Sequence, residues 1–170
     1  MMKRRIILYR ISAIIFCLTF TCQLTAQSVS YTYKALAAEG CNMKYNVVKK
    51  DACYYIIATV RSDRMYFLNE PTMKIRTFSD EVLAFNGDVI NNSSKTLGVV
   101  SGNIVIPSTS IISTAQFPVT IEQFEKIKNG VSKIRLSMTP MNHERTFKKD
   151  KIGKKLYKLF LKVKSQDEEF

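Results

Sequence analysis

Residues 117–138 read FPVTIEQFEKIKNGVSKIRLSM, and this stretch predicts a short helix between two strands. Thr120 and Gln123 have the spacing of a capping box, in which the hydroxyl and the amide each bond a backbone N–H at the start of a helix. Gly130 supplies the left-handed residue that ends many helices. The strict alternation of Ser132–Met138 then predicts a half-buried strand. We therefore expect a helix at Thr120–Asn129, and a strand before it at Ile111–Phe117.

The residues upstream have the pattern of an antiparallel meander. Cys53–Ser62 is rich in tyrosine, isoleucine, valine and threonine on both faces, which predicts a central strand. Shorter strands are expected at Met65–Leu68, Met73–Phe78 and Val82–Asn86, because turn residues separate them. The run NNSSKTLGVVSG (91–102) is polar and reads as a loop, and an edge strand at 104–106 would end at Pro107.

A basic tripeptide occurs twice, as Lys74-Ile75-Arg76 and as Lys133-Ile134-Arg135. Each lies in an alternating segment with the isoleucine inward. If the two strands are neighbours, Lys74, Arg76, Lys133 and Arg135 line one outer face and can meet phosphate or sulfate groups of an envelope glycan or lipid. The alternative is an ordinary solvated face whose charges protect sheet edges from other chains.

The C-terminal segment carries the net charge of the protein, which is +12 for the whole chain. Between Arg145 and Lys164 there are nine basic residues and one acid. The same segment predicts an amphipathic helix at Asp150–Lys164, with Asp150 near its start. Its apolar stripe would be formed by Ile152, Leu156, Leu159, Phe160 and Val163, with the lysines opposite.

Three interpretations of that helix remain open. Either it is docked on a sheet with its lysines solvated, or it lies on an anionic membrane surface, or it binds a partner protein or polyanion. The candidate binding residues are Lys154, Lys155 and Lys158. If replacing these lysines with Glu leaves binding unchanged, the last interpretation is excluded. The predicted fold class is α+β: a mostly antiparallel sheet, a short capped helix and this helix packed on one sheet face.

Residues Met1–Gln27 have the three parts of a secretory signal peptide, with basic residues, an apolar run at Ile11–Cys22 and small Ala26 before the cut. The apolar run is short of the about 20 residues of a spanning helix, which disfavours a retained anchor. Bulky Phe20 disfavours a lipoprotein cut before Cys22. We expect a signal peptide at 1–26 and one exported domain at 27–170, in the periplasm, at the cell surface or outside the cell.

Cys41 and Cys53 are the two cysteines beyond the signal segment. In an oxidising compartment a disulfide between them is the default expectation. Their spacing is neither a redox C-x-x-C motif nor part of a four-ligand zinc set. Separate burial of two free thiols is the alternative.

The motifs of common enzymes are missing. His143 is the only histidine, so metal sites with two histidines are impossible, and there is no G-x-S-x-G, Walker or G-x-G-x-x-G motif. We expect no cofactor, no metal and no nucleic acid as partner. A small hydrolase or transferase would need a site built from loops such as Asn69–Thr72 and Asn91–Gly102.

Three runs of the chain resemble a group of small exported proteins of Bacteroidota-type bacteria, a group that is functionally uncharacterised. They are YYIIATVRSDRMYFLNEPTMKIRTF (54–78), AQFPVTIEQFEKIKNGVSKIRLSM (115–138) and FKKDKIGKKLYKLF (147–160). The resemblance implies an exported α+β domain and brings no catalytic residues. The leading hypothesis is a non-catalytic envelope protein that binds a partner or anionic ligand through its basic surface. A loop-built enzyme and a structural assembly component are the alternatives.

Overall fold

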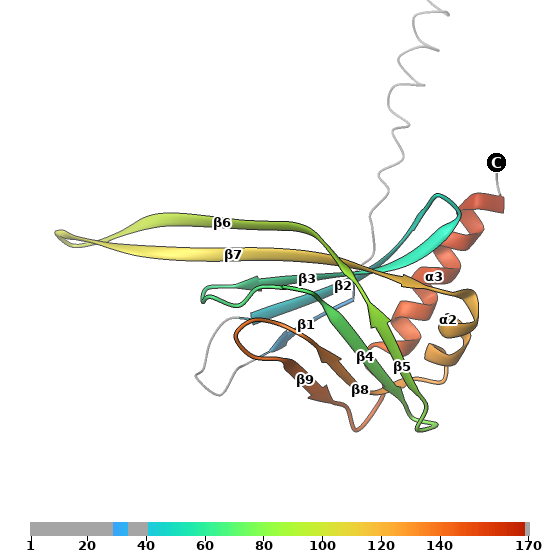
Figure 1. Cartoon of the computed structure of the whole chain (residues 1–170). Coiled ribbons are helices and arrows are strands. Elements are labelled where there is room, and N and C mark those ends of the chain that lie inside the picture. The colour runs from blue at the N-terminus through green and yellow to red at the C-terminus, as the bar shows by residue number, and fades with distance from the viewer. Residues whose placement is uncertain (1–28, 34–40, 169–170) are drawn as a thin grey trace, which may run out of the picture.

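A computed structural model describes residues 29–33 and 41–168, so the predicted signal peptide lies outside the described residues. The strands form two antiparallel sheets (Figure 1). The five-stranded sheet has the order β1 (Val29–Tyr33), β2 (Cys41–Lys50), β3 (Cys53–Ser62), β7 (Ile104–Val119) and β6 (Asp88–Ser101). The four-stranded sheet has the order β5 (Val82–Asn86), β4 (Thr72–Thr77), β8 (Val131–Leu136) and β9 (His143–Thr146). The two described helices are α2 (Ile121–Ile127) and α3 (Gly153–Glu168).

The predicted α+β class is confirmed, and β3 is the middle strand of its sheet as expected. The structure has two sheets where the sequence predicted one. The strand–helix–strand segment crosses between them, because β7 belongs to the larger sheet and β8 to the smaller. The predicted strand at Met65–Leu68 is reduced to an isolated bridge between Phe67 and Thr139.

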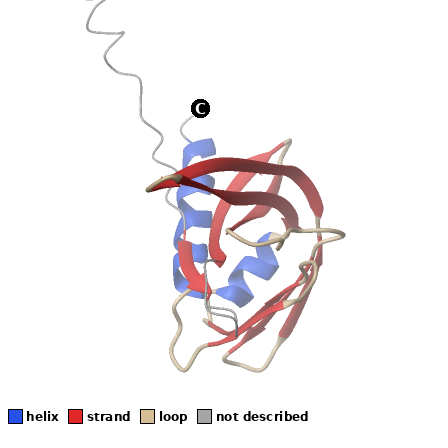
Figure 2. Cartoon of the chain, turned by 90° about the vertical axis from the view of Figure 1, so that its left-hand side faces the viewer, coloured by secondary structure: helices blue, strands red, loops and turns tan. Residues whose placement is uncertain are grey.

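The inner faces of both sheets and the apolar sides of both helices share one core (Figure 2). Phe160 of α3 stacks on Phe124 of α2 at 4.4 Å between ring centroids, and Tyr54 of β3 meets Phe160 edge-on at 5.0 Å. Buried Leu156 and Leu159 extend this contact along α3. The C-terminal helix is therefore packed on a sheet face, as predicted, and its apolar stripe faces the core of the protein.

Local side-chain bonds determine where the two helices begin. Thr120 and Gln123 form both bonds of the predicted capping box, and Gly130 has the positive φ of 90° expected after α2. Asp150 accepts the N–H groups of Ile152, Gly153 and Lys154 at the start of α3, and that of Val131 at the start of β8. Burial would raise the pKa of Asp150, but these four donors outweigh it and the pKa is lowered. The carboxylate therefore ties helix and strand together.

Gly87 makes the corner at which the chain leaves β5 and enters β6. A Cβ at this position would lie 2.6 Å from the carbonyl oxygen of Gln116 and 2.6 Å from the ring of Phe117. The backbone N–H of Gly87 also donates to the carbonyl of Pro71 at 2.9 Å. Only glycine allows the two sheets to approach this closely here.

The segment predicted as a loop, Asn91–Gly102, is a strand up to Ser101 instead. It forms most of β6 and pairs with β7 up to Ser101 and Ile104 at the hairpin tip. β7 also continues straight through Pro107, so the predicted short edge strand at 104–106 is part of a 16-residue strand. Figure 1 shows this hairpin projecting well beyond the rest of the molecule. Pattern analysis failed because both faces of the hairpin are exposed, so its residues do not alternate.

The predicted Cys41–Cys53 disulfide is wrong. Cys41 begins β2 and Cys53 begins β3, and these strands are antiparallel, with Cys53 opposite Lys50. At about 3.4 Å per residue, the nine steps along β2 from Cys41 to Lys50 separate the two cysteines by roughly 30 Å. Both cysteines are free, with Cys41 buried and Cys53 exposed.

Candidate functional site

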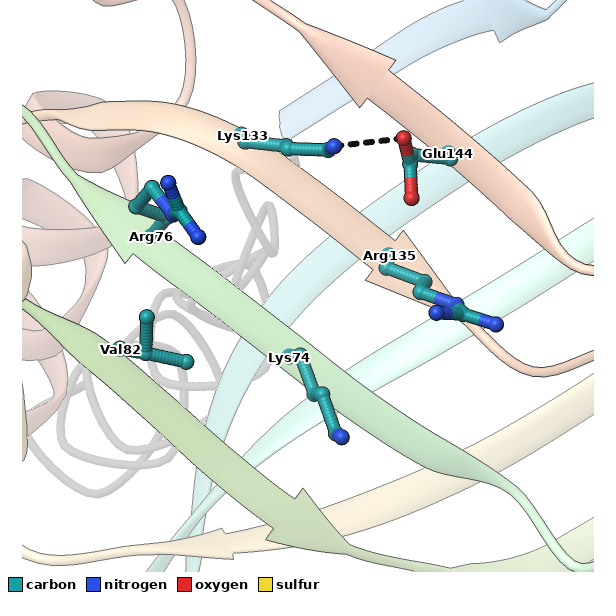
Figure 3. Close-up of a pocket in the computed structure, with 6 residues that line it drawn as sticks. All are labelled: Lys74, Arg76, Val82, Lys133, Arg135 and Glu144. Carbon is teal, nitrogen blue, oxygen red and sulfur yellow. Dashed lines mark ion pairs between the residues drawn. The ribbon is translucent and has the colours of Figure 1, made fainter. Parts of the chain in front are cut away.

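The two basic tripeptides lie side by side, as the sequence predicted. In the β4–β8 pairing, Lys74 is opposite Arg135 and Arg76 is opposite Lys133. The isoleucines between them, Ile75 and Ile134, are paired and fully buried on the inner face. We call the outer surface formed by Lys74, Arg76, Lys133 and Arg135 the cationic face. Figure 3 shows these four side chains on the same side of the sheet.

The position of these cations excludes protection of sheet edges as their reason. β4 and β8 are the two central strands of their sheet, and the edges are β5 and β9. The cations also stand opposite one another in two like-charged cross-strand pairs. Such a pair destabilises a sheet by roughly 0.2–1 kcal/mol. Four cations on this face therefore repel one another across the two strands, which a mixture of charges would not do.

Two acids moderate the charge of the cationic face. Glu144 of β9 forms an ion pair with Lys133 at 2.6 Å, and Asp80 forms one with Arg76 at 3.3 Å. The hydrogen bond from Lys133, with the charges of Lys133 and Arg135 behind it, lowers the pKa of Glu144. Among the described residues, neither Lys74 nor Arg135 has an ion-pair partner within 4.0 Å. The four cations thus retain a net positive charge.

The cationic face is hollowed. Its side chains border a concavity of about 150 Å³, which Val82 of β5 closes on one side and Glu144 on the other (Figure 3). A water molecule in the liquid occupies about 30 Å³, so the hollow can hold one group of phosphate or sulfate size. Two guanidinium groups and two ammonium groups around such a hollow are suited to oxyanions, because guanidinium forms paired hydrogen bonds and ammonium acts as a point charge.

The lysines of the C-terminal helix do not join this hollow. Lys154, Lys155 and Lys158 are exposed on α3, and none of them lines it. Within the described part of the chain they form no ion pair with any acid. Because the apolar stripe of α3 is buried, a membrane-surface helix would first have to leave the core.

His143 lies on the inner face of β9 and is fully buried. Burial, helped by the nearby charge of Arg145, lowers its pKa to about 4. A histidine in this position cannot reach a substrate in solution. The loop-built site expected for an enzyme also loses one of its two loops, because Asn91–Gly102 is a strand.

The other acidic and thiol side chains either bond to neighbouring side chains or lie far from one another. Glu81 pairs with Lys126 at 2.5 Å. Burial raises the pKa of the Cys41 thiol, which lies 3.4 Å from the hydroxyl of Ser62. Across residues 29–33 and 41–168, no three His, Cys, Asp or Glu side chains are grouped so that they could hold a metal ion. Within the same ranges, no helix is long and apolar enough to cross a membrane.

Comparison of the chain with protein-family models, with curated proteins and with solved structures finds no match.

Sequence reasoning found the four cations and missed two residues that shape the site. The sequence pattern gives Glu144 no role, and it predicts Val82 only as the first residue of a strand. The alternation within HERT (143–146) carries the signal for Glu144, because it turns the histidine inward and the glutamate outward. That signal identifies a neighbour of Lys133 only once β9 is known to pair with β8.

Proposed function

We propose that this protein is an exported, non-catalytic binding protein that holds a phosphate or sulfate group of an envelope glycan or lipid on its cationic face. One observation carries the proposal: two like-charged pairs on central strands surround a hollow that is large enough for an oxyanion. An anion bound there relieves the repulsion between the pairs and gains charge-assisted hydrogen bonds. The resemblance to small exported proteins and the signal-like first 26 residues support an envelope location.

The proposal is tested by removing the two cations that have no ion-pair partner among the described residues. The purified Lys74→Gln/Arg135→Gln variant is titrated with a sulfated oligosaccharide and with vesicles of anionic phospholipid, and the heat of binding is measured. We expect the affinity to fall about tenfold, which corresponds to about 1.4 kcal/mol. A loss of oligosaccharide binding alone identifies a glycan, and a loss of vesicle binding alone identifies a lipid.

The matched control removes two positive charges from α3 in a Lys154→Gln/Lys158→Gln variant. Both variants have the same net charge, so a general attraction would weaken equally in both. We expect the α3 variant to bind like the unmodified protein. Equal weakening in the two variants, or weakening in the α3 variant alone, would show that the cationic face is not the site.

A further inference from the structure

A second hollow lies on the outer face of the five-stranded sheet, where β3 ends and β6 and β7 continue without it. β3 pairs with β7 as far as Ser62 and Ile111, whereas β6 and β7 pair up to Ser101 and Ile104 (Figure 1). The hollow has a volume of about 600 Å³. Pockets that bind small organic molecules have volumes of about 300–1,000 Å³, so this one is large enough for more than a single ion.

The strand register explains why polar side chains gather around this hollow. Arg61 of β3 is opposite Ile112 of β7, and Ile112 is opposite Ser93 of β6. Two residues away along β7, Ser110 is opposite Lys95. Cross-strand partners and every second residue share a face of a sheet, so these side chains lie on one surface. That surface faces away from the core, because the residue of β7 that follows Ile112 is buried on the inner face.

The lining of the hollow combines hydroxyl groups with aliphatic side chains. It includes Ser93, Ser108 and Ser110, together with Leu97 and Ile112. A serine hydroxyl both donates and accepts hydrogen bonds, as each hydroxyl of a sugar does. Leu97 is 55% exposed, so it offers apolar surface to the C–H groups of a sugar ring. The lining therefore suits a molecule that is rich in hydroxyl groups and also has apolar patches.

Arg61 and Lys95 give the hollow a positive charge. They lie on the two strands that flank β7, and the register places their Cα atoms roughly 12 Å apart. The Nε–H group of Arg61 donates to the hydroxyl of Ser110 at 3.4 Å, which holds the guanidinium group over β7. Among the residues that the structure describes, no acid lines the hollow, and neither cation has an ion-pair partner within 4.0 Å. A negatively charged group between the two side chains would therefore meet both cations.

We propose that this hollow binds a saccharide that carries a carboxylate group, such as a chain of uronic acids. The carboxylate lies between Arg61 and Lys95, and the ring hydroxyls bond to Ser93 and Ser108. A carboxylate is a planar acceptor that a guanidinium group binds with two parallel hydrogen bonds. A lone inorganic anion would leave most of the hollow empty and would not use the aliphatic side chains. This site and the cationic face lie on different sheets, and neither depends on the other.

The test is the affinity of the purified protein for a trisaccharide of galacturonic acid, measured by titration calorimetry. Arg61→Gln/Lys95→Gln should bind it about tenfold more weakly, because both charge-assisted contacts are lost. Ser93→Ala/Ser108→Ala keeps the charge and should bind about fivefold more weakly, because it loses neutral hydrogen bonds. All four side chains are exposed, so circular dichroism and urea unfolding should find both variants folded.

Two matched controls remove two positive charges elsewhere on the protein. Lys154→Gln/Lys158→Gln on α3 and Lys74→Gln/Arg135→Gln on the cationic face should bind the trisaccharide like the unmodified protein. Equal weakening in the α3 variant would indicate a general attraction, and weakening in the cationic-face variant alone would assign the trisaccharide to that face. Either result would overturn the proposal. So would the absence of binding, or an equal affinity for a galactose trisaccharide, which lacks the carboxylates.

Discussion

The four-stranded sheet and the distal part of the β6–β7 hairpin (residues 95–110, the arm) differ in where their charged residues lie. The sheet places four cations on its two central strands, where no foreign strand can pair, while the long open edges of the arm carry one lysine. Charge at an open edge opposes pairing with a foreign strand, so the arm lacks a protection that the two central strands of the other sheet do not need.

The junction between the two regions offers the largest effect. Gly87→Ala places a methyl group against the Gln116 carbonyl and the Phe117 ring, neither of which can move without shifting a strand. We expect a loss of about 3 kcal/mol in the free energy of unfolding, measured by urea denaturation. Gly98→Ala is the control within the arm, since its methyl group meets only a methyl group of the Val105 side chain and should cost less than about 1 kcal/mol. Equal losses would mean that the arm is as tightly packed as the junction.

The second largest effect is expected from low pH, which should lower the stability of the four-stranded sheet. This sheet buries a titratable side chain, His143, and the arm buries none. The pKa of His143 is about 4 in the folded protein and about 6.5 in an unfolded chain. Between these values the unfolded chain binds the extra proton, so stability falls as the pH is lowered from 6.5 to 4 and this contribution levels off below 4. The loss approaches about 3 kcal/mol at the acid end.

Urea denaturation at several pH values checks this, with His143→Gln as the control that keeps a polar side chain and removes the titration. The variant should lose most of the slope between pH 6.5 and pH 4. An unchanged slope would assign it to groups other than His143.

The smallest expected effect tests whether the cationic face is strained. Lys74→Glu converts the like-charged pair with Arg135 into an opposite pair. We expect a gain of about 0.5–1 kcal/mol in unfolding free energy, together with a loss of anion binding. Lys154→Glu makes the same charge change on the exposed face of α3 and should leave stability within about 0.5 kcal/mol of the unmodified protein. A destabilised Lys74→Glu variant would show that the cations do not repel one another there.

Local patterns predicted much of the molecule. The capping box at Thr120, the left-handed Gly130 and the burial of Ile75 and Ile134 all depend on neighbours close in sequence. The alternation around each tripeptide predicts which residues point outward. The cationic face follows from it only if the two strands are neighbours. Whether the two strands are neighbours depends on pairing over a separation of about 60 residues, which no local pattern contains.

The failures share a physical cause. The disulfide prediction assumed that 12 residues bring Cys41 and Cys53 together, whereas the intervening strand and tight turn place them at opposite ends of a hairpin. Asn91–Gly102 was predicted to be a loop because its asparagines, serines and glycines follow no alternation, and a ribbon exposed on both faces needs none. In both cases the outcome depended on the extended backbone rather than on side-chain burial.

The carboxylate of Asp150 has a consequence for the order in which the protein is assembled. It joins β8 to the start of α3, and α3 supplies Phe160 to rings contributed by β3 and α2. β3 is thus synthesised about a hundred residues before the helix that completes its packing. The core shared by the two sheets is therefore incomplete until α3, the last described element of the chain, has been synthesised.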